Sequence, residues 1–170
     1  MKDLQKLIFS YPDFPKKGII FKDLLGILRD PEIFKELIIR MSESFIIKEC
    51  EAIASIDARG FIFGSPLAMI TSKPMVVFRK PGKLPGELIT AKYELEYDKN
   101  SLFIQKHAIK GFKSFAIVDD LLATGGTANC ACTLLKDLGK EVTGLSVVGE
   151  IEKLSGSKLL NVKVDSQIKF

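Results

Sequence analysis

The 170-residue sequence contains no tryptophan, one histidine and three cysteines, and this scarcity excludes several kinds of site. The cysteines, Cys50, Cys130 and Cys132, are odd in number and lack the spacing of zinc ligands. We interpret them as free thiols of a protein in the reducing cytoplasm. The histidine, His107, has no nucleophile near it in the sequence, so we place it on the surface rather than in a catalytic site.

Long apolar runs and clustered positive charge are also missing. The start of the chain lacks the apolar stretch of a signal peptide, and the run at 60–70 is too short to cross a bilayer. The net charge is +4, yet lysines and arginines are spread along the chain except for a concentration at 79–83. A nucleic-acid binder usually gathers such charge on one face or arm. The sequence therefore predicts a soluble, cytoplasmic protein that binds small phosphorylated anions, without membrane or nucleic-acid partners.

Short apolar runs alternate with helical patterns, which predicts the α/β class with a mostly parallel twisted sheet flanked by helices. The expected strands lie at 52–56, 75–79, 114–118 and 142–149. The expected helices lie at 31–48, 60–71 and 125–138. Asp30 followed by Pro31 is a strong start signal for the first of these helices.

Two stretches depart from this alternation. Residues 1–30 read as a short helix at 4–9, an irregular proline-rich arm and an apolar patch at 19–21. Residues 80–100 are rich in proline, glycine and charge, and then alternate in the manner of a hairpin. Because no linker or repeat divides the chain, we expect residues 1–170 to form a single domain. Ligands of open α/β sheets bind beyond the carboxyl ends of the strands, where polar residues follow.

The motif at 119–127 is the most informative of these polar segments. Its second half begins a helix, where converging backbone N–H groups and hydroxyls suit a terminal phosphate. The residues expected to hold that phosphate are Ala123, Thr124, Gly125, Gly126 and Thr127. The motif lacks the lysine and glycine spacing of a nucleoside-triphosphate loop, so a monophosphate is expected.

Asp119 and Asp120 open this motif and would repel a phosphate directly. They are explained if ribose hydroxyls or a hydrated Mg²⁺ lie between carboxylate and phosphate. Successive strand residues face opposite ways, so one aspartate should face the ligand more directly than the other. A helix-capping turn is the simpler alternative, but it leaves the paired aspartates and the two glycines unexplained.

The motif resembles the phosphoribosyl-pyrophosphate signature of type I phosphoribosyltransferases. Four further stretches, at 13–23, 57–61, 79–86 and 93–97, are similar to the adenine phosphoribosyltransferases. The resemblance implies the type I fold, with a small base-binding hood at 1–30 and a flexible lid at 80–100. It also implies purine salvage, in which adenine and 5-phosphoribosyl 1-pyrophosphate give AMP and pyrophosphate with Mg²⁺, catalysed by a homodimer.

By this resemblance, several cationic residues bind the pyrophosphate. Arg59 has forked donors suited to that leaving group and is expected to be catalytic. Lys80 and Lys83 would stabilise the departing anion, and Arg79 would do so across a dimer interface. A solvated basic loop is the alternative for Arg79. The resemblance further implies a non-proline cis peptide bond between Asp57 and Ala58.

The expected base site combines the hood and the lid. Glu96 is the acid–base group assigned to N7 of adenine, and Tyr97 would cover the site. Ile20, Phe21 and Lys22 would form the hood over the purine. Lys22 stands where the family usually has arginine, which leaves the detailed base contacts open.

Two alternatives remain at this point. The first is a phosphoribosyltransferase for another purine, hypoxanthine or xanthine. The second is a non-catalytic regulator that senses phosphoribosyl pyrophosphate. A regulator of this kind usually adds a nucleic-acid-binding element, and none is visible in the sequence.

Overall fold

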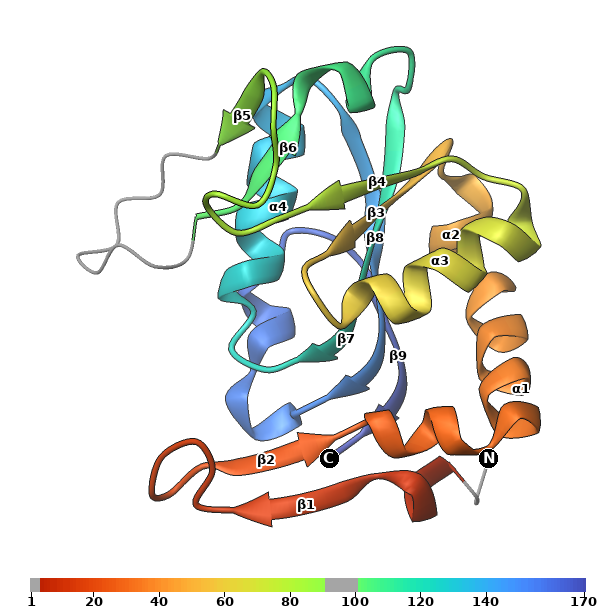
Figure 1. Cartoon of the computed structure of the whole chain (residues 1–170), viewed down its shortest axis with the longest axis vertical. Helices are drawn as coiled ribbons and strands as arrows, with labels where there is room; N and C mark the ends of the chain where they lie inside the picture. Colours follow the sequence, from red (N-terminus) through yellow and green to blue (C-terminus); the bar gives the residue numbers. More distant parts are fainter. Residues whose placement is uncertain (1–3, 91–100) are drawn as a thin grey trace.

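The structure, a computed structural model, describes residues 4–90 and 101–170, and its centre is a sheet covered by helices on both faces (Figure 1). The strand order is β4-β3-β7-β8-β9, and every pair is parallel. The strands are β3 (Ala52–Ile56), β4 (Met75–Phe78), β7 (Ser114–Leu122), β8 (Glu141–Glu150) and β9 (Val164–Lys169). The predicted α/β class and parallel sheet are confirmed, and β9 is a strand that the sequence analysis did not expect.

The helices bury apolar residues against both faces of this sheet. They are α1 (Pro31–Ser42), α2 (Phe45–Glu49), α3 (Gly60–Thr71) and α4 (Gly126–Asp137). One core cluster joins residues of the first three helices to the sheet, and the other joins residues of α4 to it. Both faces of β7 are therefore buried, which explains its continuous apolar sequence.

The first helix begins as predicted but ends earlier. The Asp30 carboxylate accepts hydrogen bonds from the backbone N–H groups of Glu32 and Ile33, and Pro31 occupies the first turn. The single helix expected at 31–48 was wrong, because α1 ends at Ser42 and α2 follows. Ser44 precedes α2 with an extended ψ of 138°, and this conformation interrupts the helical hydrogen bonds.

The amino-terminal segment forms an ordered hairpin beside the sheet. Its elements are η1 (Leu4–Leu7), β1 (Phe9–Pro12), β2 (Ile20–Asp23) and η2 (Leu25–Arg29), with β1 antiparallel to β2. The irregular arm predicted at 11–18 was therefore wrong only at its start, where β1 continues to Pro12, and the helix expected at 4–9 ends at Leu7. The turn between the strands contains a cis Phe14–Pro15 bond and is tied by Gly18, whose N–H donates to Asp13 Oδ1 at 2.7 Å.

A second hairpin lies beside β4. It pairs β5 (Leu88–Thr90) with β6 (Phe103–Gln105), and Arg79 and Phe103 exchange two backbone hydrogen bonds of 2.9 and 2.8 Å. The remaining elements are three short 3-10 helices, η3 (Lys106–Ile109), η4 (Glu152–Leu154) and η5 (Gly156–Leu159). In the described part of the chain, no helix combines the length and apolarity needed to cross a membrane.

Candidate active site

The last residues of β7 project beyond their neighbour β3. The β3–β7 ladder ends at the pair Ser55 and Val118, whereas the β7–β8 ladder continues to Leu122 and Glu150. Residues 119–122 are therefore held by sheet hydrogen bonds on the β8 side only. On the β3 side these residues have no partner strand. They lie at the carboxyl end of the sheet, where ligands of this architecture bind. The sequence predicted this strand's start correctly but ended it at 118.

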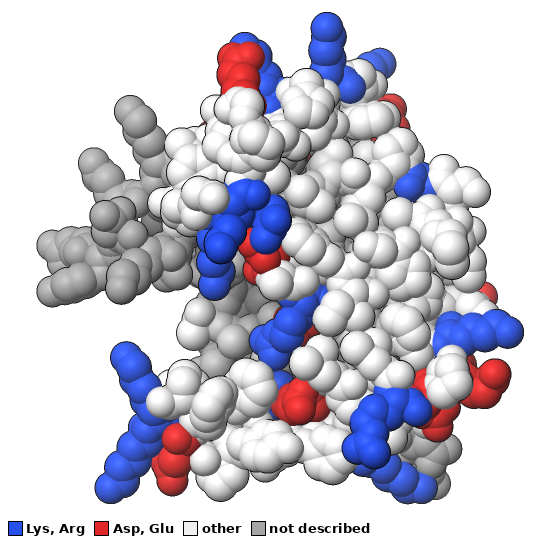
Figure 2. All heavy atoms as spheres, viewed as in Figure 1, with Lys and Arg blue, Asp and Glu red and all other residues white. Residues whose placement is uncertain are grey.

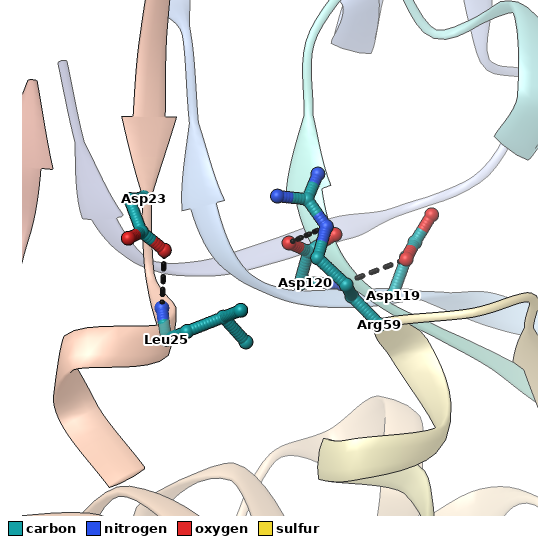
Figure 3. Close-up of polar contacts among 5 residues, drawn as sticks. All are labelled: Asp23, Leu25, Arg59, Asp119 and Asp120. Atoms are coloured by element: carbon teal, nitrogen blue, oxygen red, sulfur yellow. Dashed lines mark hydrogen bonds and ion pairs between the residues drawn. The ribbon is translucent and has the colours of Figure 1, made fainter. Parts of the chain in front are cut away.

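The two aspartates of this projecting segment point in different directions (Figure 3). Asp119 Oδ1 accepts a hydrogen bond of 2.8 Å from the N–H of Asp120, and Asp119 lines a cavity together with residues 121–128. Asp120 Oδ2 lies 2.9 Å from Arg59 Nε in an ion pair, and only 5% of the Asp120 side chain is exposed. Asp119 thus faces the cavity more directly, whereas Asp120 faces the arginine.

Burial destabilises the ionised forms of these two carboxylates. Desolvation raises the pKa of Asp119 well above its usual range, and the charge of Asp120 raises it further. Desolvation also raises the pKa of Asp120, while the guanidinium of Arg59 opposes that shift. The pair therefore carries more negative charge than its single arginine offsets when both groups are ionised. A hydroxyl donor or a hydrated cation at this position would relieve the repulsion.

The donor set agrees with a weakly held Mg²⁺ rather than a metal cage. Among residues 4–90 and 101–170, no group of three or more His, Cys, Asp or Glu side chains could hold a metal ion. Mg²⁺ commonly uses one or two carboxylates and takes its other ligands from substrate oxygens and water. Asp119 and Asp120 fit that pattern, directly or through water.

The predicted phosphate cradle lies where β7 turns into α4. The cavity here measures about 90 Å³ and is lined by the loop, the first turn of the helix, Leu145 and Val147. Gly125 precedes the helix with φ of 84°, a left-handed conformation in which a side chain is strained. The N-terminus of the 12-residue helix directs unpaired N–H groups and positive potential toward the cavity.

Gly156 packs against the predicted cradle, and the sequence analysis did not single it out. A Cβ atom added to Gly156 would lie 2.2 Å from the carbonyl oxygen of Ala123 and 2.9 Å from the nitrogen of Gly125. Conversely, a Cβ atom on Gly125 would lie 2.5 Å from the carbonyl oxygen of Gly156. The start of η5 therefore supports the cradle through direct backbone contact, which requires glycine on both sides. Only the small polar residues around Gly156 hint at a turn in the sequence.

The loop after β3 carries the predicted cis bond and Arg59. The peptide bond between Asp57 and Ala58 is cis, as predicted. Arg59 stands at the start of α3 and reaches across to β7, as Figure 3 shows. Arg79, which follows β4, donates from Nε to Asp57 Oδ2 at 3.0 Å. Two arginines thus meet the ends of β3 and β7, and Arg79 is held by a carboxylate of its own chain.

Several lysine and arginine side chains border a hollow on one face of the molecule. Figure 2 shows lysine and arginine side chains around a hollow between the β1–β2 hairpin and the rest of the chain. Lys80 and Lys83 lie in the exposed loop that follows β4 and Arg79. The predicted lid residues Glu96 and Tyr97 lie outside the described residues, as does the alternating pattern at 93–97.

The hood residues Ile20, Phe21 and Lys22 all lie on β2. The guanidinium carbon of Arg59 lies 5.3 Å from the ring centroid of Phe21, which joins the hood to the ion pair on β7. The rings of Phe14 and Phe21 pack edge to face with centroids 5.2 Å apart. Ile20 is 58% exposed, so its apolar side chain is available to a ligand. The structure thus brings one expected base residue, Phe21, next to one expected pyrophosphate residue, Arg59.

The parallel sheet, the predicted cradle at its carboxyl end and the adjacent acidic pair are the features that the sequence resemblance to phosphoribosyltransferases led us to expect. The family described as "Phosphoribosyl transferase domain" matches residues 27–161. Within this class, the chain is 56% identical to the adenine phosphoribosyltransferase of Prochlorococcus marinus strain MIT 9312 over 170 residues, which is 100% of both chains. The chain belongs to the adenine phosphoribosyltransferase family.

Solved structures agree with this assignment. The adenine phosphoribosyltransferase of Thermoanaerobacter pseudethanolicus superposes with a TM-score of 0.91 at 42% identity, covering 99% of each chain. The Saccharomyces cerevisiae enzyme, in complex with an imino-altritol bisphosphate and adenine, has a TM-score of 0.87 at 38% identity. That likeness covers 97% of this chain and 96% of the yeast chain.

Proposed function

We propose that this protein is a purine-salvage transferase that forms AMP and pyrophosphate from adenine and 5-phosphoribosyl 1-pyrophosphate. The observation that carries the proposal is the contact chain from the cradle to the hood. Asp119 lines the cradle, Asp120 pairs with Arg59, and Arg59 lies against Phe21. Sites for the sugar phosphate, the leaving group and the base therefore adjoin one another. Adenine in the yeast complex supports that choice of base.

The cradle would hold the 5-phosphate of the ribose. Backbone N–H groups at the start of α4 and the hydroxyls of Thr124 and Thr127 are the donors, and Gly125 and Gly126 leave room for close approach. Asp119 and Asp120 would accept hydrogen bonds from the ribose hydroxyls. With substrate present, Mg²⁺ near these carboxylates would neutralise charge on the pyrophosphate.

The leaving group would be bound by cations on neighbouring elements. Arg59 holds one position beside β7, and Lys80 and Lys83 extend from the loop after β4. Arg79 donates to Asp57 through Nε alone, so we infer that it can act on pyrophosphate across a dimer interface through its terminal nitrogens without giving up this hydrogen bond. Positive charge at these positions stabilises the anion that develops as its bond to the ribose breaks.

The base would lie under the hood. Ile20 and Phe21 supply apolar surface, and Lys22 supplies a cation on the same strand. From the family resemblance, Glu96 would exchange a proton at N7 of adenine and Tyr97 would cover the site. Residues 1–30 then act as the hood and 80–100 as the lid of a single domain.

We also propose a homodimer that acts in the cytoplasm. Met69 and Ile70 on α3 are 78% and 47% exposed, and a partner subunit would cover such apolar side chains. The free thiols of Cys50, Cys130 and Cys132 suit a reducing compartment. Light scattering of the purified protein would test the dimer, and a monomer at micromolar concentration would contradict it.

The activity can be tested by mass spectrometry of the products. Purified protein, Mg²⁺ and phosphoribosyl pyrophosphate should convert adenine to AMP, with hypoxanthine and xanthine as matched control bases. Faster turnover of a control base would reassign the substrate. Absence of any nucleotide product would reject the transferase activity.

A further inference from the structure

The hood hairpin contacts the rest of the protein through two cation–π pairs carried by consecutive residues. Phe21 supplies the ring that meets Arg59, as described above. Lys22 supplies a cation, and its Nζ lies 4.6 Å from the ring centroid of Phe170. The first pair involves residues assigned to the site. The second pair involves Phe170, which has no assigned role and follows β9 at the sheet edge.

Phe170 is fixed to the sheet by its backbone and by its ring. Its N–H donates to the carbonyl oxygen of Glu150 at 2.9 Å, and its carbonyl accepts from the N–H of Glu152 at 3.1 Å. The ring packs on Gly149, where an added Cβ atom would lie 2.9 Å from a ring carbon and 3.1 Å from Leu121 Cδ1. Leu121 lines the phosphate cradle. The position of the ring is thus set by the same strands that carry the cradle.

Lys22 is held on the hairpin side of this contact. Its Nζ donates a hydrogen bond of 2.9 Å to Ser10 Oγ, and Ser10 is its register partner on β1. No carboxylate of the described residues forms an ion pair with Lys22. The face of the Phe170 ring is therefore a contact through which this ammonium group meets the sheet. The contact spans both strands of the hairpin and the edge of the sheet.

We propose that Phe170 is a positioning residue for base binding, acting through Lys22. The ring holds the β1–β2 hairpin in the position, relative to the sheet, in which Ile20 and Phe21 contact the purine. Phe170 itself touches no substrate. This inference rests on the proposed AMP-forming activity. The expected effect is specific to adenine binding. A displaced hairpin loses contacts with adenine, whereas the phosphate cradle stays intact.

The test compares four variants with the wild-type protein. Phe170→Leu removes the π face but keeps apolar volume, and Lys22→Met removes the cation at similar length. Phe170→Tyr keeps the π face and is the conservative rescue. Lys169→Met is the matched control, since it removes a charge one residue away whose ion pairs are with Glu152 at 3.1 Å and Glu150 at 3.8 Å.

Steady-state kinetics with each substrate varied should separate positioning from general stability. Phe170→Leu and Lys22→Met should each raise the KM for adenine by about three- to tenfold, the effect of one lost cation–π pair. The KM for phosphoribosyl pyrophosphate and kcat should stay within about twofold. Phe170→Tyr and Lys169→Met should match the wild type. The double variant Lys22→Met/Phe170→Leu should be no worse than the poorer single variant, because the two residues act as one pair.

Three outcomes would overturn the proposal. They are an unchanged KM for adenine in Phe170→Leu, an equal rise of both KM values, or additive effects in the double variant. If Phe170→Leu does not fold, Phe170→Met, which also removes the π face and keeps apolar volume, takes its place in the same comparison of the two KM values. Failure of the proposed function is separate, because the wild-type protein would then form no AMP from adenine.

Discussion

Replacing Gly156 by alanine tests whether the contact between η5 and the cradle keeps the phosphate site in shape. The new Cβ atom would stand 2.2 Å from the carbonyl oxygen of Ala123, whereas ordinary contacts begin near 3.4 Å. Both partners are backbone and cannot rotate away, so the two loops must separate by about 1 Å. Overpacking of this kind costs about 1–3 kcal/mol of folding free energy. For a chain of this length, each kcal/mol lowers Tm by about 2–4 °C.

The separation should also damage substrate binding, since the displaced atoms belong to the loop that leads into α4. A misplacement of about 1 Å can reduce catalytic efficiency by about 100-fold, so we expect kcat/KM for phosphoribosyl pyrophosphate to fall by about 10- to 100-fold. The assay is AMP formation at saturating adenine, with thermal unfolding measured in parallel. Ser157→Ala is the control on the same 3-10 helix and should behave as the wild type. A wild-type kcat/KM for phosphoribosyl pyrophosphate in Gly156→Ala would refute the reasoning.

Four further outcomes are expected. Gly126→Ala should leave Tm unchanged, because its Cβ atom would meet no protein atom within 4 Å. The same variant should raise the KM for phosphoribosyl pyrophosphate. An unchanged KM would show that Gly126 is not part of the site. Asp119→Asn should raise Tm most near pH 8 and progressively less toward pH 4. Because the pKa of Asp119 is raised in the native state, the native state binds more protons than the unfolded chain in this pH range. The stability of the wild-type protein therefore falls as the pH rises, and the asparagine variant escapes that loss. A pH-independent difference would argue against a buried, destabilised carboxylate. Cys132, whose pKa burial raises to about 11, should be alkylated at pH 8 at least about 100-fold more slowly in the native protein than in urea, as followed by peptide mass spectrometry. Glu96→Gln should lower kcat by about 10²–10⁴, and wild-type turnover would reject its acid–base role.

The central sheet and the cradle could be predicted because their signals are local. The buried strands are continuous apolar runs, and the segment at 119–127 carries its glycines, hydroxyls and aspartates within nine residues. β9 escaped prediction because Asp165, Ser166 and Gln167 lie on an edge strand that needs no apolar run. The β1–β2 hairpin escaped because its strands have four residues each and its turn contains Pro15.

The missed parts of the site depend on contacts between distant residues. Gly156 touches Ala123 and Gly125 across about thirty residues, and Lys22 meets Phe170 across nearly the whole chain. No periodicity or short motif encodes such contacts. The pairing of Arg59 with Asp120 was also invisible in the sequence, although both residues were singled out separately, because it depends on the close approach of α3 to β7.

The extension of β7 past β3 has a consequence for attempts to engineer this protein. The carboxylates at 119 and 120 belong to a strand that is continuous with the core, and no hinge separates them from Ile117 or Val118. Mutations that shift the packing of β7 in the core would therefore also displace the two carboxylates of the proposed ribose site. A library designed for heat resistance should avoid β7 and its partner β8 and sample the outer surface of α1, which carries no residue of the proposed site.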